Sequence, residues 1–179
     1  LLSTYSAERQ PVAQQLIDFD REWSTLMARK PEEISDPTEL ATFYLGTAEF
    51  PSGFMTQYSS SMIVTDAAHQ HPAAGFPIGK RFASVEVVRV GDGNAVHLGH
   101  HAKADGRWRI YAFAGPEASA FDAWAAWMSS PESPLALYTP AGADVDAVFD
   151  VKAIYQGRYE DVDIARVPEV FLPKTGPLG

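Results

Sequence analysis

Residues 105–116 read Asp-Gly-Arg-Trp-Arg-Ile-Tyr-Ala-Phe-Ala-Gly-Pro, and this stretch decides the fold class. Asp105-Gly106 is typical of a tight turn, and the run from Trp108 to Phe113 has little polarity beyond Arg109, which predicts a short strand covered on both faces. Gly115-Pro116 ends the strand, and a helical pattern begins directly after it. Strand, short loop and helix in this order indicate a layered α/β domain.

The loop after this strand carries no reactive group. In α/β enzymes such a loop often holds the reacting residues, whereas here it offers only Ala114, Gly115 and Pro116. These residues supply no nucleophile, acid or phosphate-binding turn. We therefore predict a scaffold without an active site, and assign no catalytic, cofactor-binding or metal-binding residue to the chain.

Composition narrows the class of protein. A length of 179 residues suits one domain, or one domain with part of another, and the net charge of -9 argues against nucleic acid or an anionic membrane as partner. No apolar run approaches the roughly 18 residues of a membrane span, so a cytoplasmic protein is expected. The absence of cysteine excludes disulfides and thiol chemistry. Because the chain opens on Leu1 rather than Met, we expect a fragment of a longer polypeptide.

Two helices are predicted before residue 47. Because Pro11 is tolerated only near a first turn, the first helix is placed over residues 10–29, after a turn at residues 6–9. Its apolar stripe comprises Val12, Leu16, Phe19, Trp23 and Leu26. The second helix is expected from Asp36 as N-cap to about Leu45, with three residues buried: Leu40, Phe43 and Tyr44.

The later elements are predicted from β-rich runs and helical spacing. We expect a strand in 82–90, a turn at 91–94, a short segment at 95–98, a helix over 118–128 and a strand over 147–155. The tail at residues 167–172 is expected to add an edge element.

Several residue groups were considered as sites, and for each a structural role is favoured. His69, His71, His97, His100 and His101 suggest a metal, but they lie in predicted loops without a carboxylate at helical spacing. Gly91-x-Gly93-x-x-Val96 is a partial dinucleotide fingerprint, interpreted as a hairpin turn because no helix follows.

Ser59, Ser60 and Ser61 lack a nucleophile elbow and are interpreted as connector residues. Lys80 and Arg81, with Arg107 and Arg109, could bind an anion or simply form rim charges on an acidic protein. Four tryptophans are expected in a core or an interface: Trp23, Trp108, Trp124 and Trp127.

Two sets of motifs carry a family resemblance. Residues 1–13, Leu-Leu-Ser-Thr-Tyr-Ser-Ala-Glu-Arg-Gln-Pro-Val-Ala, resemble the closing helix of the FAD and substrate domains in flavin-dependent aromatic hydroxylases, the phenol 2-monooxygenase and 3-hydroxybenzoate 4-monooxygenase group. The second set resembles the C-terminal domain of that group: Gly75 to Arg81, Val87-Val88-Arg89, Val96 to Gly99 and Asp105 to Phe113.

The resemblance implies a thioredoxin-like C-terminal domain, a mixed sheet flanked by helices, without a redox cysteine pair and associated with dimerisation. It implies three parts: residues 1–46 as terminal helices of the FAD and substrate part, 47–74 as a connector, and 75–179 as the C-terminal domain. The parent enzyme would use FAD and NAD(P)H to hydroxylate a phenolic ring, whereas this chain would bind neither.

One connector segment is similar to a cofactor motif of the same family. Residues 65–69, Thr-Asp-Ala-Ala-His, resemble its Gly-Asp-Ala-Ala-His motif. Thr65 replaces the glycine, and the segment follows the first motif instead of preceding it, so the similarity is interpreted as chance. We expect a homodimer joined to an upstream FAD and substrate domain. The alternative is a free-standing thioredoxin-like module that binds small aromatic ligands through its Trp and His clusters.

Overall fold

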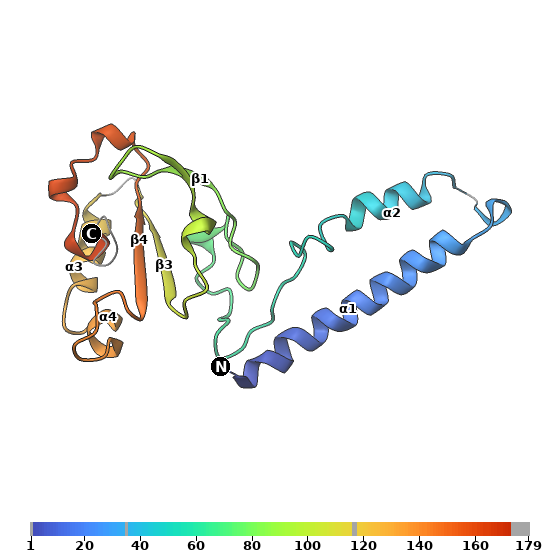
Figure 1. Cartoon of the computed structure of the whole chain (residues 1–179), viewed down its shortest axis with the longest axis horizontal. Coiled ribbons are helices and arrows are strands. Elements are labelled where there is room, and N and C mark those ends of the chain that lie inside the picture. Colours follow the sequence, from blue (N-terminus) through green and yellow to red (C-terminus); the bar gives the residue numbers. More distant parts are fainter. Residues whose placement is uncertain (1, 35, 116–117, 173–179) are drawn as a thin grey trace. The chain divides into compact units, whose positions relative to one another are not determined.

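The computed structural model describes residues 2–34, 36–115 and 118–172, and it divides into two compact units, Leu1–Ala83 and Ser84–Gly179 (Figure 1). The first unit is helical and the second contains the strands. This confirms the α/β class with a preceding helical segment. The thioredoxin-like label and the three-part division at residues 46 and 74 stay predictions.

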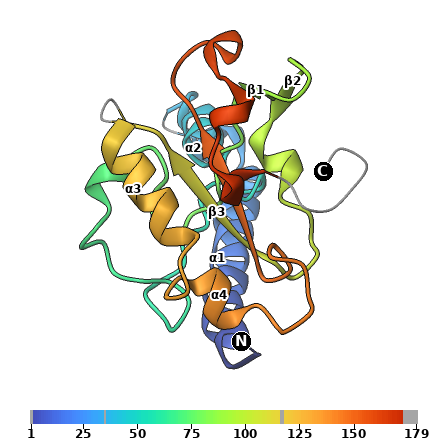
Figure 2. The same cartoon turned by 90° about the vertical axis from the view of Figure 1, so that its left-hand side faces the viewer.

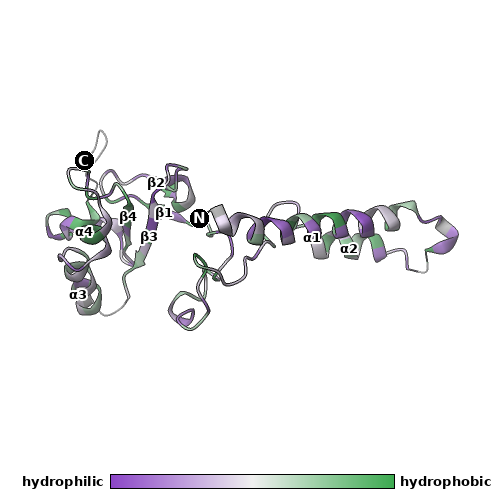
Figure 3. Ribbon diagram, turned by 90° about the horizontal axis from the view of Figure 1, so that it is seen from below, coloured by the Kyte–Doolittle hydropathy of each residue, from purple (hydrophilic) through white to green (hydrophobic). Residues whose placement is uncertain are grey.

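The first unit is built on an antiparallel pair of helices, α1 (Leu2–Ala28) and α2 (Glu39–Thr47), joined through the 3-10 turn η1 (Pro31–Glu33) (Figure 1). Rings from the apolar stripe of α1 meet rings of α2. Phe19 stacks on Phe43 at 5.8 Å between centroids, and Trp23 lies 5.9 Å from Phe43. Hydrophobic and hydrophilic bands alternate along both helices (Figure 3).

The predicted start of the first helix was wrong, because α1 continues through Pro11 and begins eight residues earlier than expected. Proline removes one backbone hydrogen bond from a helix, and contacts with the connector offset that loss. Arg9 Nη1 donates to the Tyr58 hydroxyl at 2.7 Å, and Thr4 is buried. Tertiary contacts therefore extend the helix beyond its local signal.

The second helix begins later than predicted and buries less. Asp36 Oδ1 accepts from the Thr38 backbone N–H at 2.8 Å, so the aspartate closes a turn just before α2. Leu40 and Tyr44 are exposed, and Phe43 is only half-buried, in contrast to the expectation for all three. In the described first unit, a single neighbouring helix leaves much of each helix surface uncovered.

The second unit begins with an antiparallel hairpin, β1 (Glu86–Val88) and β2 (Ala95–His97), followed by the 3-10 turn η3 (Leu98–His101). Two parallel strands form its other pair, β3 (Trp108–Phe113) and β4 (Phe149–Ile154), in which Ile110 aligns with Val151. The chain between them forms α3 (Ala118–Met128) and α4 (Pro134–Tyr138). Three 3-10 turns follow β4: η4 (Tyr159–Asp161), η5 (Ile164–Arg166) and η6 (Glu169–Phe171).

The core of the second unit lies between the parallel pair and α3 with α4 (Figure 2). Met128 is 2% exposed and Leu135 4% exposed, and both pack with Val151. Ile110, Trp124 and Phe171 close the cluster from three elements. Since side chains alternate along a strand, the opposite face of β3 and β4 carries Arg109, Tyr111, Asp150 and Lys152.

Most predicted elements of this unit were found, with three corrections. The first strand is shorter than residues 82–90 because only Glu86–Val88 pair with β2. The tail forms η6 rather than an edge element, since its 3-10 turn packs Val170 and Phe171 on the core. The ends of β3 are not covered on both faces: Trp108 is 49% and Phe113 40% exposed.

Candidate functional site

The loop after β3 supplies mainly backbone. Ala114 is buried and its N–H donates to Ile154 O at 2.9 Å, while Gly115 is exposed. Pro116, the third residue of the predicted empty loop, lies outside the described residues. The described part of the loop therefore acts to end the parallel strand pair.

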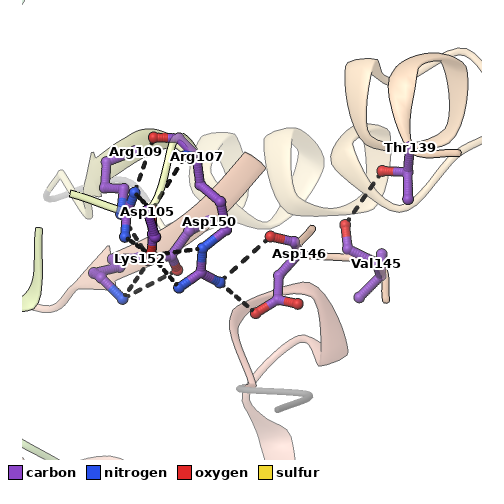
Figure 4. A network of polar contacts seen from close by, with 8 residues as sticks. All are labelled: Asp105, Arg107, Arg109, Thr139, Val145, Asp146, Asp150 and Lys152. Atoms are coloured by element: carbon purple, nitrogen blue, oxygen red, sulfur yellow. Dashed lines mark hydrogen bonds and ion pairs between the residues drawn. The ribbon is translucent and has the colours of Figure 1, made fainter. Parts of the chain in front are cut away.

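A network of charged side chains links the start of β3 to the turn before it (Figure 4). The Asp105 carboxylate accepts from Arg107 Nε at 3.0 Å and Nη2 at 2.9 Å. It also accepts from Arg109 Nη1 at 2.6 Å and Nη2 at 2.7 Å. Hydrogen bonds from Arg109, then Arg107, hold the pKa of Asp105 well below its usual range. The carboxylate thus stays charged over the physiological pH range.

The same network crosses to β4 and the turn before it (Figure 4). Arg109 Nε lies 3.2 Å from Asp150 Oδ2, and Lys152 Nζ donates to Asp150 Oδ1 at 3.0 Å. Arg107 Nη1 donates to Asp146 Oδ2 at 3.0 Å. The side chains of Arg109 and Asp150 are only 9% and 13% exposed. Because residues 109 and 150 are register partners, their ion pair favours the observed alignment.

The four basic residues weighed as an anion site or as rim charges belong to two different units. Arg107 and Arg109 are already paired with carboxylates of the second unit. Lys80 and Arg81 belong to the first unit. The two arginines of β3 and its turn are therefore structural, and the sequence signal for this role was Asp105 two and four residues before them.

The five histidines are distributed over the two units. His69 and His71 lie in the first unit, whereas the rings of His97 and His100 are 5.4 Å apart in the second. Within the described residues, no group of three or more potential metal ligands occurs. Burial, followed by the positive charges of Lys152 and Arg89, lowers the pKa of His101.

The segment at Gly91 and Gly93 is a hairpin turn, as predicted. The Arg89 N–H donates to Asn94 O at 2.9 Å, and Asp92 binds the side chains of both Arg89 and Asn94. Gly93 has φ +69°, a backbone conformation that favours glycine. Strand β2 follows directly, so this turn lacks the helix that a dinucleotide site requires.

The connector polar residues stabilise local turns. Ser61 Oγ accepts from the N–H groups of Ile63 and Val64, both at 3.2 Å. Asp66 Oδ1 accepts from the Ala68 N–H at 3.0 Å. An FAD phosphate site needs backbone donors at the start of a helix that follows a strand. Residues 65–69 form a turn closed by its own hydrogen bond instead, and the interpretation of their motif as a chance similarity stays a prediction.

An exposed apolar patch lies at the amino-terminal ends of β3 and β4. We call it the strand-end patch, and it comprises Trp108, Leu137, Tyr138 and Val145. These side chains are 49%, 63%, 66% and 42% exposed respectively. Phe149 links Trp108 and Tyr138 of the patch, since it aligns with Trp108 and its ring centroid lies 6.4 Å from that of Tyr138.

Local hydrogen bonds hold the patch in place. Ser133 Oγ caps α4 by accepting from the Ala136 N–H at 3.2 Å, and Thr139 Oγ1 donates to Val145 O at 3.4 Å (Figure 4). Of these residues, only Trp108 was predicted from the sequence to lie in a core or an interface. The signal for α4 was present in Ser133-Pro134, a cap followed by proline.

None of the helices in the described part of the chain is both long enough and apolar enough to span a membrane.

Comparison with known proteins decides the family. Residues 56–179 match the family model described as phenol hydroxylase, C-terminal dimerisation domain. The chain belongs to this family. The match confirms the resemblance to the C-terminal part of flavin-dependent aromatic hydroxylases.

Curated relatives of this dimerisation domain are longer proteins. The chain is 43% identical to 3-hydroxybenzoate 4-monooxygenase of Comamonas testosteroni, over 100% of the chain and 30% of the relative. It is 31% identical to FAD-dependent monooxygenase terD of Aspergillus terreus, over 98% of the chain and 31% of the relative. It is 36% identical to phenol 2-monooxygenase fsqG of Aspergillus fumigatus, over 80% of the chain and 26% of the relative. The chain thus spans about 30% of the length of such relatives.

Proposed function

We propose that this chain is the dimerisation domain of an FAD-dependent monooxygenase that hydroxylates phenolic compounds. The observation that carries the proposal is the family match over residues 56–179. The names of relatives in three organisms, which include phenol 2-monooxygenase and FAD-dependent monooxygenase, support the reaction class. The chain itself would not catalyse: FAD would supply the oxygen chemistry, and NAD(P)H the reducing equivalents, in the remaining part of the enzyme.

The strand-end patch is proposed as the contact between two copies. Trp and Tyr are enriched in protein interfaces, and a two-fold axis would bring the same patch of each copy together. Leu137 and Tyr138 expose most of their surface on one short helix, where neither is needed for the core. Burying them against a second copy would remove apolar surface from water.

The first 46 residues are proposed to pack against the FAD and substrate part of the same polypeptide. The stripe of α1 is only partly covered by α2, and several large apolar side chains remain exposed on the two helices: Ile17, Met27, Tyr44 and Leu45. An upstream reading frame that encodes Gly-x-Gly-x-x-Gly before Leu1 would support this assignment. A stop codon directly upstream would contradict it.

Sedimentation equilibrium of the 179-residue chain tests dimerisation. We expect a dimer at tens of micromolar and at least about tenfold weaker association for Leu137→Glu, because the variant buries a charge in the contact. Ile164→Glu is the control, since Ile164 is 53% exposed in the same unit but outside the patch. Wild-type monomer at this concentration would refute dimerisation by the isolated chain. A dimer that survives Leu137→Glu but not Trp23→Ala would move the contact to α1.

A further inference from the structure

A groove with basic side chains is present within the first unit. It has a volume of about 670 Å³, in the range of small-molecule sites. Arg9 from α1 and Lys80 with Arg81 from the end of the first unit contribute its positive charge. Apolar lining comes from both sides, including Leu16 of α1 and Phe50. The groove therefore combines a cationic part with an apolar part, within one compact unit.

Among the described residues, none forms an acidic partner for the three cations of the groove. Among the residues that the structure describes, the groove lining includes no Asp or Glu. In the same described set, ion pairs involve other basic residues and none involves Arg9, Lys80 or Arg81. Three cations that line one groove form a locally positive site in a chain of net charge -9.

Hydrogen bonds orient the cationic end of the groove. Arg9 Nη1 donates to the Tyr58 hydroxyl oxygen at 2.7 Å. The hydroxyl hydrogen of Tyr58 is then able to donate to an anion. Arg81 lies over the Phe54 ring with its guanidinium carbon 5.3 Å from the centroid. This cation–π contact orients one of the three charges before any ligand arrives.

The wall that carries Lys80 and Arg81 is hydrogen-bonded to the connector at residues 57 and 58. The Tyr58 N–H donates to Gly79 O at 3.0 Å, and Gln57 pairs with Lys80 in an isolated antiparallel bridge. Gly79 has φ +77°, and a Cβ there would overlap the Tyr58 carbonyl oxygen. Gln70 Oε1 accepts from the Ile78 N–H at 2.7 Å on the same wall. Such preorganisation reduces the entropy that a ligand must overcome.

We infer that this groove binds a small organic anion: a carboxylate or phosphate group joined to an aromatic or aliphatic body. The anionic group lies among Arg9, Lys80 and Arg81 and accepts a hydrogen bond from Tyr58. The apolar body lies along Leu16 and Phe50. Tyr58, Lys80 and Arg81 lie within the family match over residues 56–179, but none of the groove residues belongs to the strand-end patch, so this inference does not rest on the proposed contact between copies.

Calorimetric titration of the 179-residue chain with four probes tests the inference. The probes are benzoate, phenyl phosphate, inorganic phosphate and benzyl alcohol, at low and high salt. Benzoate and phenyl phosphate are expected to bind, more weakly at high salt. Inorganic phosphate lacks the apolar body and benzyl alcohol lacks the charge, so each is expected to bind at least about tenfold more weakly.

Two variants locate the binding. The double variant Lys80→Gln with Arg81→Gln is expected to weaken phenyl phosphate binding by at least about tenfold, since it removes two charge-assisted contacts. Arg21→Gln is the matched control: Arg21 lies on the same helix as Arg9, outside the groove, with a side chain 73% exposed. The affinity of the Arg21→Gln variant for phenyl phosphate should stay within about twofold of wild type. Far-UV circular dichroism checks that both variants retain the helical content of wild type.

Four outcomes would overturn the inference. These are no binding of benzoate or phenyl phosphate at millimolar concentration, equal binding in the double variant, equal binding of benzyl alcohol, and equal binding of inorganic phosphate. Sedimentation equilibrium on the double variant tests whether a second copy of the chain occupies the groove. Loss of a dimer in that variant, without probe binding by wild type, would place a second copy of the chain in the groove instead of a small ligand.

Discussion

The two units bury their apolar residues very differently. In the described residues, each buried hydrophobic side chain lies in the second unit: Leu98, Ala114, Ala125, Met128, Leu135 and Val151. The first unit has aromatic contacts between α1 and α2 but leaves Ile17 and Met27 more than half exposed. A strand pair, two helices and a folded tail enclose a core, whereas two helices side by side provide only one contact stripe.

This contrast separates stability from recognition. The second unit has a buried cluster of core side chains, and its exposed strand-end patch lies outside that cluster. The first unit depends more on specific links between α1 and the connector, such as Arg9 with Tyr58. Substitutions in each unit therefore test whether core packing or connector geometry carries more of the free energy of unfolding.

The largest effect is expected in the core of the second unit. Met128→Ala should lower the free energy of unfolding by about 3 kcal/mol, because it leaves a cavity beside Leu135 and Val151. Met27→Ala is the matched change on α1, where methionine is 57% exposed, and should cost less than about 0.5 kcal/mol. Urea unfolding followed by circular dichroism compares them. Equal costs would show that the first unit is packed as tightly as the second.

The second largest loss of free energy of unfolding is expected when a carboxylate is removed from the charged network around Arg109. Asp150→Ala leaves Arg109 and Lys152 without one shared partner and should cost about 2 kcal/mol, since Arg109 is largely buried. Asp18→Ala on α1 removes an exposed ion pair with Arg21 and should cost less than about 0.5 kcal/mol. Urea unfolding of both variants measures the difference. A cost for Asp150→Ala no larger than that for Asp18→Ala would mean that the network contributes little.

A matched pair of glycines, both in the first unit, tests the close approach of residues 58 and 79. Gly79→Ala should cost about 2 kcal/mol, because the new Cβ meets the Tyr58 backbone in addition to the strain of a positive φ. Gly53→Ala has a similar φ of +74° but open space around the Cβ, and should cost about 1 kcal/mol. Thermal unfolding of each variant provides the comparison. The same melting temperature for both would leave the close approach of residues 58 and 79 without support.

The smallest effect is a pH dependence at His101. Burial and the charges of Lys152, Arg89 and His100 lower its pKa, opposed by Asp150, so folding favours the neutral ring. As the pH is lowered below the ordinary histidine pKa of about 6.5, the unfolded chain binds more protons than the folded chain. The free energy of unfolding therefore decreases until the pH is also below the lowered pKa of the folded state. His101→Gln should reduce this slope in urea unfolding between pH 7 and 5. An unchanged slope would exclude His101 as its source.

Local sequence patterns predicted several elements well. The helix over 118–128 was found at those residues, and the turn at 91–94 was found between β1 and β2. Such elements depend on helical spacing, glycine positions and short-range hydrogen bonds, all of which are visible in a few consecutive residues. The start of α1 was missed because its first turns are held by Tyr58, 49 residues from Arg9.

The candidate sites were less accessible to sequence reasoning. Lys80 and Arg81 were noted, but Arg9 joins them only when α1 lies beside the connector. The sequence does not show that Arg107 and Arg109 are paired, because their partners Asp146 and Asp150 lie about 40 residues further along the chain. Only folding decides whether charged side chains that are distant in sequence form ion pairs or line a groove together.

The sequence by itself determined the α/β class, the family resemblance and the hairpin at Gly93, because these depend on local pattern and motif order. The tertiary structure alone decided which arginines are neutralised and which line a groove. It also decided that Trp108 is half-exposed while Trp124 packs on the core. The physical reason is that burial and ion pairing depend on distances between side chains, which residue order along the chain does not specify.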